Sequence, residues 1–324
     1  MAAGRVTGAG ARPGQVRGVR FVVAPSRMRW LSVRHRLHLL LGRSFAYLML
    51  LNISFVFLFP VLYLLVTSAQ TVEDFVDPTV YWIPTKIQWD NYVLAFKGLF
   101  YPQALLNSTV VSGLSAVGQV LSASLAGYGF ARGRFPGRDV LFMLAMLTFL
   151  IPPQTIIVPL FMLYKTLGWI DTYAPFIVPS FFAHGLRGAL FIFVFRQFFR
   201  GQPWELEEAA RIDGAGALRT YLQIMLPLAR PAVLVVFLFS LVWHWNDFFE
   251  PSVYLYNQAR FTLPLRLNIF YTGLQIVTGA QAGELYNEPL LMAASLLVII
   301  GPLLIYLVAQ RYFVQSIERT GLVE

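Results

Sequence analysis

Long apolar runs separated by shorter polar segments dominate the chain. Six runs approach the roughly 20 residues that a helix needs to cross the hydrocarbon core of a bilayer. They cover Phe45–Thr67, Leu105–Ala126, Val140–Tyr164, Tyr173–Phe195, Pro231–Trp245 and Pro289–Ala309. The fifth run is short unless it begins before Pro231 or extends past Trp245. The pattern predicts an all-α integral membrane protein with six transmembrane helices, formed by residues 44–324.

Composition agrees with lipid as the solvent. The chain is 57% hydrophobic and 13% charged, whereas a soluble domain carries about 25% charged residues. There is no cysteine, which excludes disulfides, iron–sulfur clusters and thiolate metal sites. The four histidines lack metal-ligand spacing, so we expect no metal site and no cofactor bound by this chain.

The net charge of +9 comes from the beginning of the chain, because residues 1–43 hold nine arginines and no acidic residue. This segment is predicted to be a disordered cytoplasmic tail that contacts membrane lipid rather than nucleic acid, since it directly precedes a long apolar run. That run is about twice as long as the apolar core of a signal peptide. We therefore expect an uncleaved first span.

The positive charges also predict the orientation. Six spans place both termini on the same side of the membrane. With the termini in the cytoplasm, nineteen basic residues fall in inside segments and five in outside segments. Because cytoplasmic loops are enriched in arginine and lysine, both termini are predicted to be cytoplasmic.

The most informative polar segment is Gln202–Pro231, between the fourth and fifth predicted spans. Pro203 suits the first turn of a helix, and Gly214 and Gly216 then interrupt it. Four apolar residues at helical spacing follow, which are Leu218, Tyr221, Leu222 and Met225. The segment predicts two short helices that meet at a glycine turn, with Pro227 ending the second. From these residues alone, a surface loop packed on the bilayer is equally consistent.

Seven residues of this loop follow the spacing E-A-A-x₃-G-x₉-I-x-L-P. They are Glu208, Ala209, Ala210, Gly214, Ile224, Leu226 and Pro227. The pattern resembles the signature loop of permease subunits in ATP-binding-cassette importers, whose transmembrane fold is the type I importer fold. The resemblance implies coupling helices that dock into a cleft on the ATPase. Glu208 is then a polar contact with the ATPase, the two alanines permit close approach, and Gly214 makes the turn. Asp213, which precedes this glycine, is also assigned to the coupling site.

Shorter blocks elsewhere are similar to carbohydrate-importer permeases of the maltose-permease kind, including their glycerol-3-phosphate relatives. These blocks are Ile151–Gln154, Val158–Phe161, Phe195–Phe199, Trp245–Phe248, Thr262–Pro264 and Gln310–Val314. The resemblance implies the smaller permease of a heterodimeric pair. It also implies three partners: a second six-span permease, an ATPase dimer and an extracytoplasmic solute-binding protein. ATP and magnesium then belong to the ATPase, and this chain is not an enzyme.

Polar and aromatic residues in or beside the spans are candidates for the solute pathway. They are Asn107, Gln119, Arg187, Trp243, Asn246 and Asp247. Arg187 is predicted to lie near the middle of the fourth span, where a charge must face protein or water. It either forms a structural ion pair or lines the pathway. The aromatic residues at the end of the fifth span are equally typical of an interfacial belt.

Four other interpretations remain open. A secondary transporter needs coupling-ion residues within its spans, but the predicted spans contain few acidic residues. A membrane enzyme needs clustered acids, histidines or a nucleophile–base pair. The basic tail is also consistent with an adaptor or lipid-binding role. Co-purification with an ATPase separates the importer from these three. A permease for a solute other than a sugar fits the same loop motif.

Overall fold

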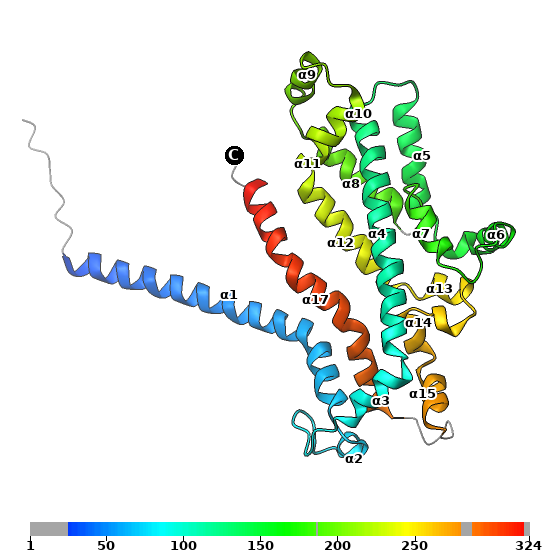
Figure 1. Ribbon diagram of the computed structural model, residues 1–324. Coiled ribbons are helices and arrows are strands. Elements are labelled where there is room, and N and C mark those ends of the chain that lie inside the picture. Colours follow the sequence, from blue (N-terminus) through cyan, green and yellow to red (C-terminus); the bar gives the residue numbers. More distant parts are fainter. Residues whose placement is uncertain (1–24, 186, 280–286, 321–324) are drawn as a thin grey trace, which may run out of the picture. The chain divides into compact units, whose positions relative to one another are not determined.

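The computed structural model describes the backbone of residues 25–185, 187–279 and 287–320, and the side chains of residues 40–185, 187–279 and 287–310. All regular secondary structure in these residues is helical (Figure 1), as predicted. The chain divides into two compact units, residues 1–61 and residues 62–324.

Helix α1 (Pro25–Ser68) includes the first predicted span. Its side chains between residues 40 and 61 are all exposed. Most are apolar, and Phe57 is 77% exposed. A helix that is apolar around its circumference needs lipid or another protein around it. The helix also includes residues 25–43 of the predicted disordered tail, while residues 1–24 lie outside the described residues.

Two helices of the second unit, α4 (Tyr101–Arg132) and α17 (Glu288–Thr320), contain the second and sixth predicted spans. Helix α4 packs along α8 (Gly188–Arg200) and α12 (Arg230–Asn246). Small residues allow these helices to approach closely. A Cβ at Gly127 would lie 2.6 Å from a side chain of α8, so this crossing leaves no room for a larger residue.

The third predicted span is broken into α5 (Arg138–Leu150) and α6 (Pro153–Thr166), which meet at 99°. Ile151 and Pro152 are extended between them. Proline lacks an amide donor and disfavours helical backbone in the residue before it. The two prolines therefore turn the chain, a larger change than the kink predicted from the sequence.

The fourth predicted span is also two helices, α7 (Ala174–Ser180) and α8. Positive φ angles at Ala183, Gly185 and Arg187 turn the chain between them. A Cβ at Gly188 would lie 2.3 Å from the Ala183 carbonyl oxygen, so the close approach of residue 188 to the Ala183 backbone requires glycine. The fourth predicted span is therefore interrupted near its middle, and Arg187 directly precedes the first turn of α8.

The fifth predicted span corresponds to α12, which has 17 residues. Before it lie α10 (Ala217–Thr220), a π-helical turn (Tyr221–Met225) and α11 (Leu226–Leu228), and the chain bends by 78° where α12 begins. By length and composition, the described residues contain three helices able to cross a membrane, or five spans if each of the two bent pairs counts as one.

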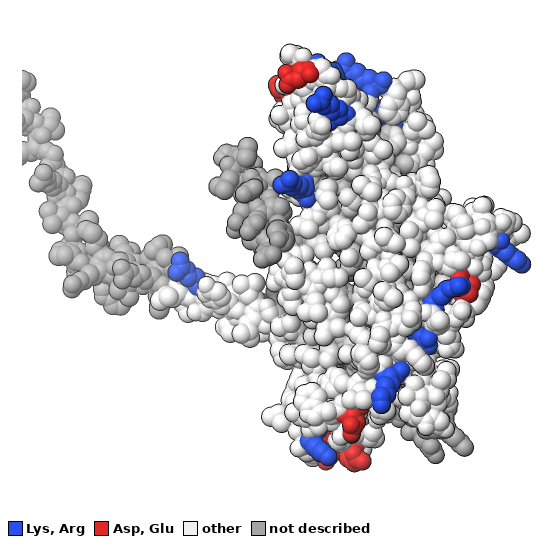
Figure 2. All heavy atoms as spheres, viewed as in Figure 1, with Lys and Arg blue, Asp and Glu red and all other residues white. Residues whose placement is uncertain are grey.

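Short helices lie at both ends of α4 (Figure 1). Helix α9 (Glu205–Ile212) lies at the end formed by Arg132. The helices at the other end are α2 (Val72–Val76), α3 (Asp90–Gly98), α13 (Phe249–Tyr254), the 3₁₀ turn η2 (Gln258–Arg260), α14 (Leu263–Asn268) and α15 (Phe270–Thr278). Charged side chains on the visible face lie mainly at these two ends and along one edge (Figure 2). The broad uncharged surface between them suits lipid or protein contact.

Candidate functional site

The 202–231 loop begins with α9, which projects beyond the end of α4 (Figure 1). Pro203 precedes the helix, and its first turn carries Glu205, Glu207 and Glu208. Carboxylates at this position interact favourably with the positive end of the helix dipole. These three glutamates therefore stabilise the start of α9.

Gly214 ends α9 with a φ of +78°, in the left-handed region that glycine adopts at little cost. Its amide donates to the carbonyl of Arg211 over 3.0 Å, and the amide of Ala215 donates to the carbonyl of Ala210 over 2.9 Å. This pair of bonds is the Schellman motif, which satisfies carbonyls at a helix end. A Cβ at Gly214 would meet nothing within 4 Å, so the backbone angle, not space, favours glycine.

The predicted coupling residues divide between an outer and an inner side of the loop. The exposed ones are Glu208, Ala209, Asp213, Gly214 and Pro227, whereas Ala210 is buried and Ile224 and Leu226 are half-buried. Ile212, which no motif position includes, is 86% exposed. Ile212 thus exposes an apolar side chain between the charged residues Arg211 and Asp213.

The second half of the loop differs from its prediction in two ways. Of the predicted apolar face, Tyr221 and Met225 are buried, but Leu218 and Leu222 are 64% and 51% exposed. The π-helical turn changes the period of the helix, so the four residues no longer share one face. Pro227 does not end the helix, because it lies in the first turn of α11.

A buried ion pair that the sequence did not predict fixes α9. Arg132, at the end of α4, lies with its Nε 3.3 Å from Glu207 Oε1, and both side chains are 3% exposed. Its guanidinium also lies 4.4 Å from the ring centroid of Trp204. Arg132 and Glu207 are 75 positions apart, so no local pattern connects them.

Two of the predicted pathway residues make structural contacts. Asn107 is buried and donates from Nδ2 to the carbonyl oxygens of Ala259, over 2.8 Å, and Phe261, over 2.9 Å. Gln119 donates from Nε2 to the His184 carbonyl over 2.7 Å. These contacts hold α4 against the loop of residues 259–261 and against the break between α7 and α8.

The three candidates at the end of α12 do not share one site. The Trp243 ring lies 5.5 Å from the rings of Phe191 and Phe239, and Asn246 is exposed. Asp247 accepts from the amides of Phe249 and Glu250, over 3.1 and 3.4 Å, and so caps the start of α13.

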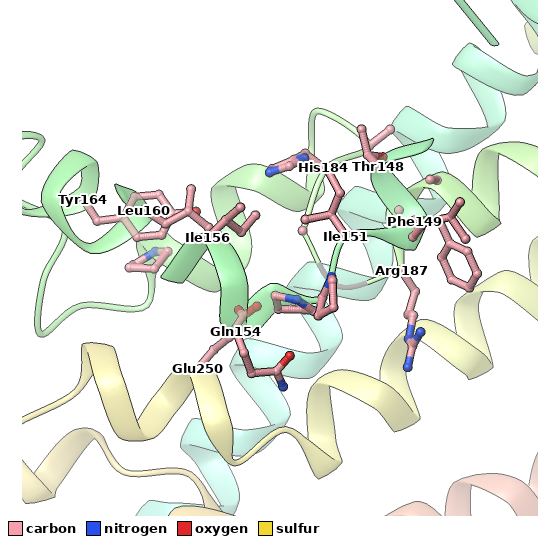
Figure 3. Close-up of a pocket in the computed structure, with 18 of the residues that line it drawn as sticks. Thr148, Phe149, Ile151, Gln154, Ile156, Leu160, Tyr164, His184, Arg187 and Glu250 are labelled. Carbon is pink, nitrogen blue, oxygen red and sulfur yellow. The ribbon is translucent and has the colours of Figure 1, made fainter. Parts of the chain in front are cut away.

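A cavity of about 460 Å³ lies where the two broken spans meet α13 (Figure 3). Phe149 and Gln154 line it from the break between α5 and α6, and Arg187 lines it from the start of α8. The Arg187 guanidinium lies 5.6 Å from the Phe149 ring and 5.4 Å from the Trp243 ring. Of the predicted pathway residues, Arg187 is the one that lines this cavity.

Glu250 lines the same cavity from α13 and is not among the pathway residues predicted from the sequence. Burial of its carboxyl group, together with the nearby charge of Asp247, raises the pKa of Glu250. Within the described residues, Arg187 forms no salt bridge with Glu250 or with any other carboxylate. The cavity thus presents a cation beside aromatic rings, and a carboxyl group that favours its neutral form.

Comparison with known families identifies the chain. The family described as binding-protein-dependent transport system inner membrane component matches residues 119–319, which is more than half of the sequence. The chain belongs to this family. The matched region begins within α4 and includes the whole 202–231 loop. The membrane prediction thus agrees with the family, whose members are inner membrane proteins.

Several curated permeases are similar over most of their length. A probable ABC transporter permease of Pyrococcus horikoshii is 31% identical, covering 82% of this chain and 92% of that protein. The sn-glycerol-3-phosphate transport system permease protein UgpE of Agrobacterium fabrum is 30% identical, covering 86% and 97%. The arabinooligosaccharides transport system permease protein AraQ of Halalkalibacterium halodurans is 30% identical, covering 83% and 92%.

The fold is shared with a solved transporter. The crystal structure of a bacterial ABC transporter involved in the import of the acidic polysaccharide alginate contains a chain that aligns with a TM-score of 0.70 and 22% identity. The alignment covers 85% of this chain and 96% of that chain. The family match and the similar permeases show that the chain is a permease component of a binding-protein-dependent transport system, as the loop motif predicted.

Proposed function

We propose that the chain is the permease subunit of an ATP-driven importer for a sugar or sugar-like solute. The observation that carries the proposal is the exposed outer side of the 202–231 loop, which presents Glu208, Ala209 and Asp213 beyond the end of α4. Two similar permeases are named for sn-glycerol-3-phosphate and for arabinooligosaccharides. Both solutes are polyhydroxylated, which supports a solute of that class.

In this proposal the loop docks on an ATPase dimer, which binds ATP and magnesium and performs the hydrolysis. Glu208 makes the polar contact, while Ala209 allows close approach. The exposed side chains of Ile212, Leu218 and Leu222 add apolar area, and full burial of a side chain of this size contributes about 1.5–3 kcal/mol. Ala210, Ile224 and Leu226 support the surface from within, and this chain itself catalyses no reaction.

The proposed topology is the type I importer fold with six spans. Helices α1, α4, α12 and α17 each cross the membrane, and the α5–α6 and α7–α8 pairs cross as broken spans. Both termini are then cytoplasmic, because six spans place them on the same side of the membrane as the 202–231 loop, and the excess of basic residues in the inside segments of the sequence favours this orientation. Residues 69–103 and 245–288 lie outside, where they meet the solute-binding protein, and a second six-span permease completes the pathway.

The cavity beside Arg187 is the proposed contribution of this chain to the solute pathway. Aromatic rings suit the apolar faces of sugars, and Gln154 and Glu250 supply hydrogen-bonding groups at the same cavity. Arg187 favours a second candidate solute class, a phosphorylated or acidic sugar, because an arginine without a carboxylate partner binds phosphate and carboxylate groups well. Uptake of labelled sn-glycerol-3-phosphate, compared with a labelled neutral arabinooligosaccharide, separates the two classes.

Replacing Glu208 by lysine tests the coupling role. Glu208→Lys is expected to abolish solute uptake and to reduce co-purification of the ATPase, with membrane insertion unchanged. Glu205→Lys is the matched control, because Glu205 is exposed in the same helical turn but lies outside the motif. Unchanged uptake together with unchanged ATPase co-purification in Glu208→Lys would refute the proposed function.

A further inference from the structure

One stripe of α4 holds both halves of the 202–231 loop. Ser124, Tyr128 and Arg132 are spaced four residues apart on this helix, and residues at this spacing lie above one another on the same face. Each of the three contacts the loop or the helix that precedes it. The stripe therefore connects the proposed ATPase-docking surface to α4, which packs along α8 and α12.

The first half of the loop is held by Arg132. Besides its ion pair with Glu207 and its position over the Trp204 ring, Arg132 donates from Nη2 to the Gln202 carbonyl oxygen. One guanidinium thus contacts the start of the loop through a backbone oxygen, an aromatic face and a carboxylate. Arg211 lies 3.8 Å from the other oxygen of Glu207, so the carboxylate has cations on two sides.

The second half of the loop is held by the other two residues of the stripe. The Tyr221 hydroxyl forms a buried 2.7 Å hydrogen bond with the Ser124 hydroxyl. The Tyr128 ring lies 5.2 Å from the Tyr221 ring and 5.5 Å from the Phe199 ring. Since both halves of the loop are anchored to one rigid helix, the loop and this end of α4 are expected to move together.

The opposite end of α4 is anchored as firmly. Asn107 donates to the carbonyl oxygens of Ala259 and Phe261, and Ser108 accepts from the amide of Leu263 over 2.8 Å. From Asn107 to Arg132 the helix rises about 37 Å at 1.5 Å per residue. A single rigid helix therefore joins the 202–231 loop to the loop of residues 259–263 on the opposite side of the proposed membrane region.

We propose that the Arg132–Glu207 ion pair is the joint through which movement of the 202–231 loop passes into α4. The inference rests on the proposed function, in which an ATPase moves this loop. Arg132 is a positioning residue: it is nearly fully buried, so it does not offer a surface to the ATPase. Without it, the ATPase still binds the exposed side of α9, but the motion of the loop is no longer transmitted to the spans.

The test uses the full complex in proteoliposomes and a reporter that needs no identified solute. Because the chain has no cysteine, Gln154→Cys places one thiol at the cavity, and its rate of modification by a membrane-impermeant maleimide reports access to the pathway. ATP with vanadate is expected to change this rate in the parent protein. Arg132→Met is expected to shrink that change by about fivefold or more, the lower end of typical coupling between two sites, while ATP hydrolysis and ATPase co-purification persist.

Two further variants keep the test decisive. Exchange of the charges, Arg132→Glu with Glu207→Arg, is expected to restore part of the ATP-dependent change that each single variant loses, which a merely structural role would not do. Arg132→Lys keeps the charge without the guanidinium fork, and its ATP-dependent change in labelling rate is expected to lie between those of the parent protein and Arg132→Met. If Arg132→Met fails to assemble, Arg132→Lys decides the question. Arg134→Met is the control, because Arg134 is exposed near the same tryptophan.

A parent-like ATP-dependent change in Arg132→Met would overturn the proposal, and so would a parent-like change in Arg132→Lys if Arg132→Met does not assemble. The proposal would also be overturned if these variants lost ATPase co-purification and the ATP-dependent change in labelling rate in the same proportion. Such a result would mean that the loop is misfolded and no longer binds the ATPase. Failure of the proposed function has a different signature. In that case Glu208→Lys retains the ATPase, and ATP with vanadate does not change the labelling rate even in the parent protein.

Discussion

Replacing Gly214 by alanine tests how the 202–231 loop keeps its shape. The φ of +78° at this position costs a residue with a Cβ roughly 1–2 kcal/mol. Nothing lies within 4 Å of the Cβ that alanine would add, so no steric term enters and the penalty is conformational. A penalty of this size lowers the ratio of closed to open helix end by about 5–30-fold.

Hydrogen exchange measures this ratio directly. The Gly214 and Ala215 amides close the end of α9, and in Gly214→Ala the amides at positions 214 and 215 are expected to exchange about 5–30-fold faster. Gly216→Ala is the matched control, because Gly216 also has nothing within 4 Å of an added Cβ but has an ordinary φ of −72°. Weaker ATPase co-purification is expected in the first variant only.

Equal exchange rates at positions 214 and 215 in the two variants would refute the reasoning. The left-handed turn would then contribute nothing to the shape of the loop. The Gly214→Asn variant adds a graded point, because asparagine tolerates left-handed backbone better than alanine does. Its exchange rates are expected to lie between those of the parent protein and Gly214→Ala.

Two further predictions concern the cavity. Gly188→Ala is expected to destabilise the reconstituted protein by about 1–3 kcal/mol, measured as a lower Tm, because the added Cβ would lie 2.3 Å from the Ala183 carbonyl oxygen. Gly113→Ala is the control, because a Cβ at Gly113 would meet nothing within 4 Å. Equal Tm values for the two variants would contradict the close approach of residue 188 to the Ala183 backbone. Burial raises the pKa of Glu250 from 4.5 to about 8, so the folded state holds this proton at higher pH than the unfolded state, and the free energy of unfolding falls as pH rises across that window. Glu250→Gln is expected to flatten the fall of Tm between pH 4.5 and 8, and an unchanged slope would show that the carboxyl group is not buried.

The sequence predicts the helices better than their breaks. Apolar runs of adequate length predict α1, α4 and α17, because length and hydropathy alone decide whether a helix suits a bilayer. Pro152 and Pro153 signal a break, but the resulting angle of 99° depends on how α5 and α6 pack. The break at Arg187 has only a weak local signal, two nearby glycines, and depends on the close return of Gly188 to Ala183.

The candidate site shows the same division. Gly214 is predictable because a left-handed helix end is a local property of the backbone. The exposure of Leu218 and Leu222 is not, because the π-helical turn that rotates them away from Tyr221 forms only in the packed structure. The Arg132–Glu207 pair also lies beyond sequence patterns. Its two members come from different helices, and in the sequence Arg132 is one of many arginines near the ends of spans.

The orientation of the 202–231 loop decides whether an ATPase can reach it. The absence of cysteine allows Glu208→Cys to be labelled alone in the chain with a membrane-impermeant maleimide, with Trp89→Cys, in the predicted outer loop, as the reciprocal control. The account predicts that Glu208→Cys reacts in inside-out vesicles stripped of ATPase, that added ATPase protects it, and that it stays unlabelled in right-side-out vesicles. Labelling of Glu208→Cys from the outer side would contradict the assignment of this loop to ATPase coupling.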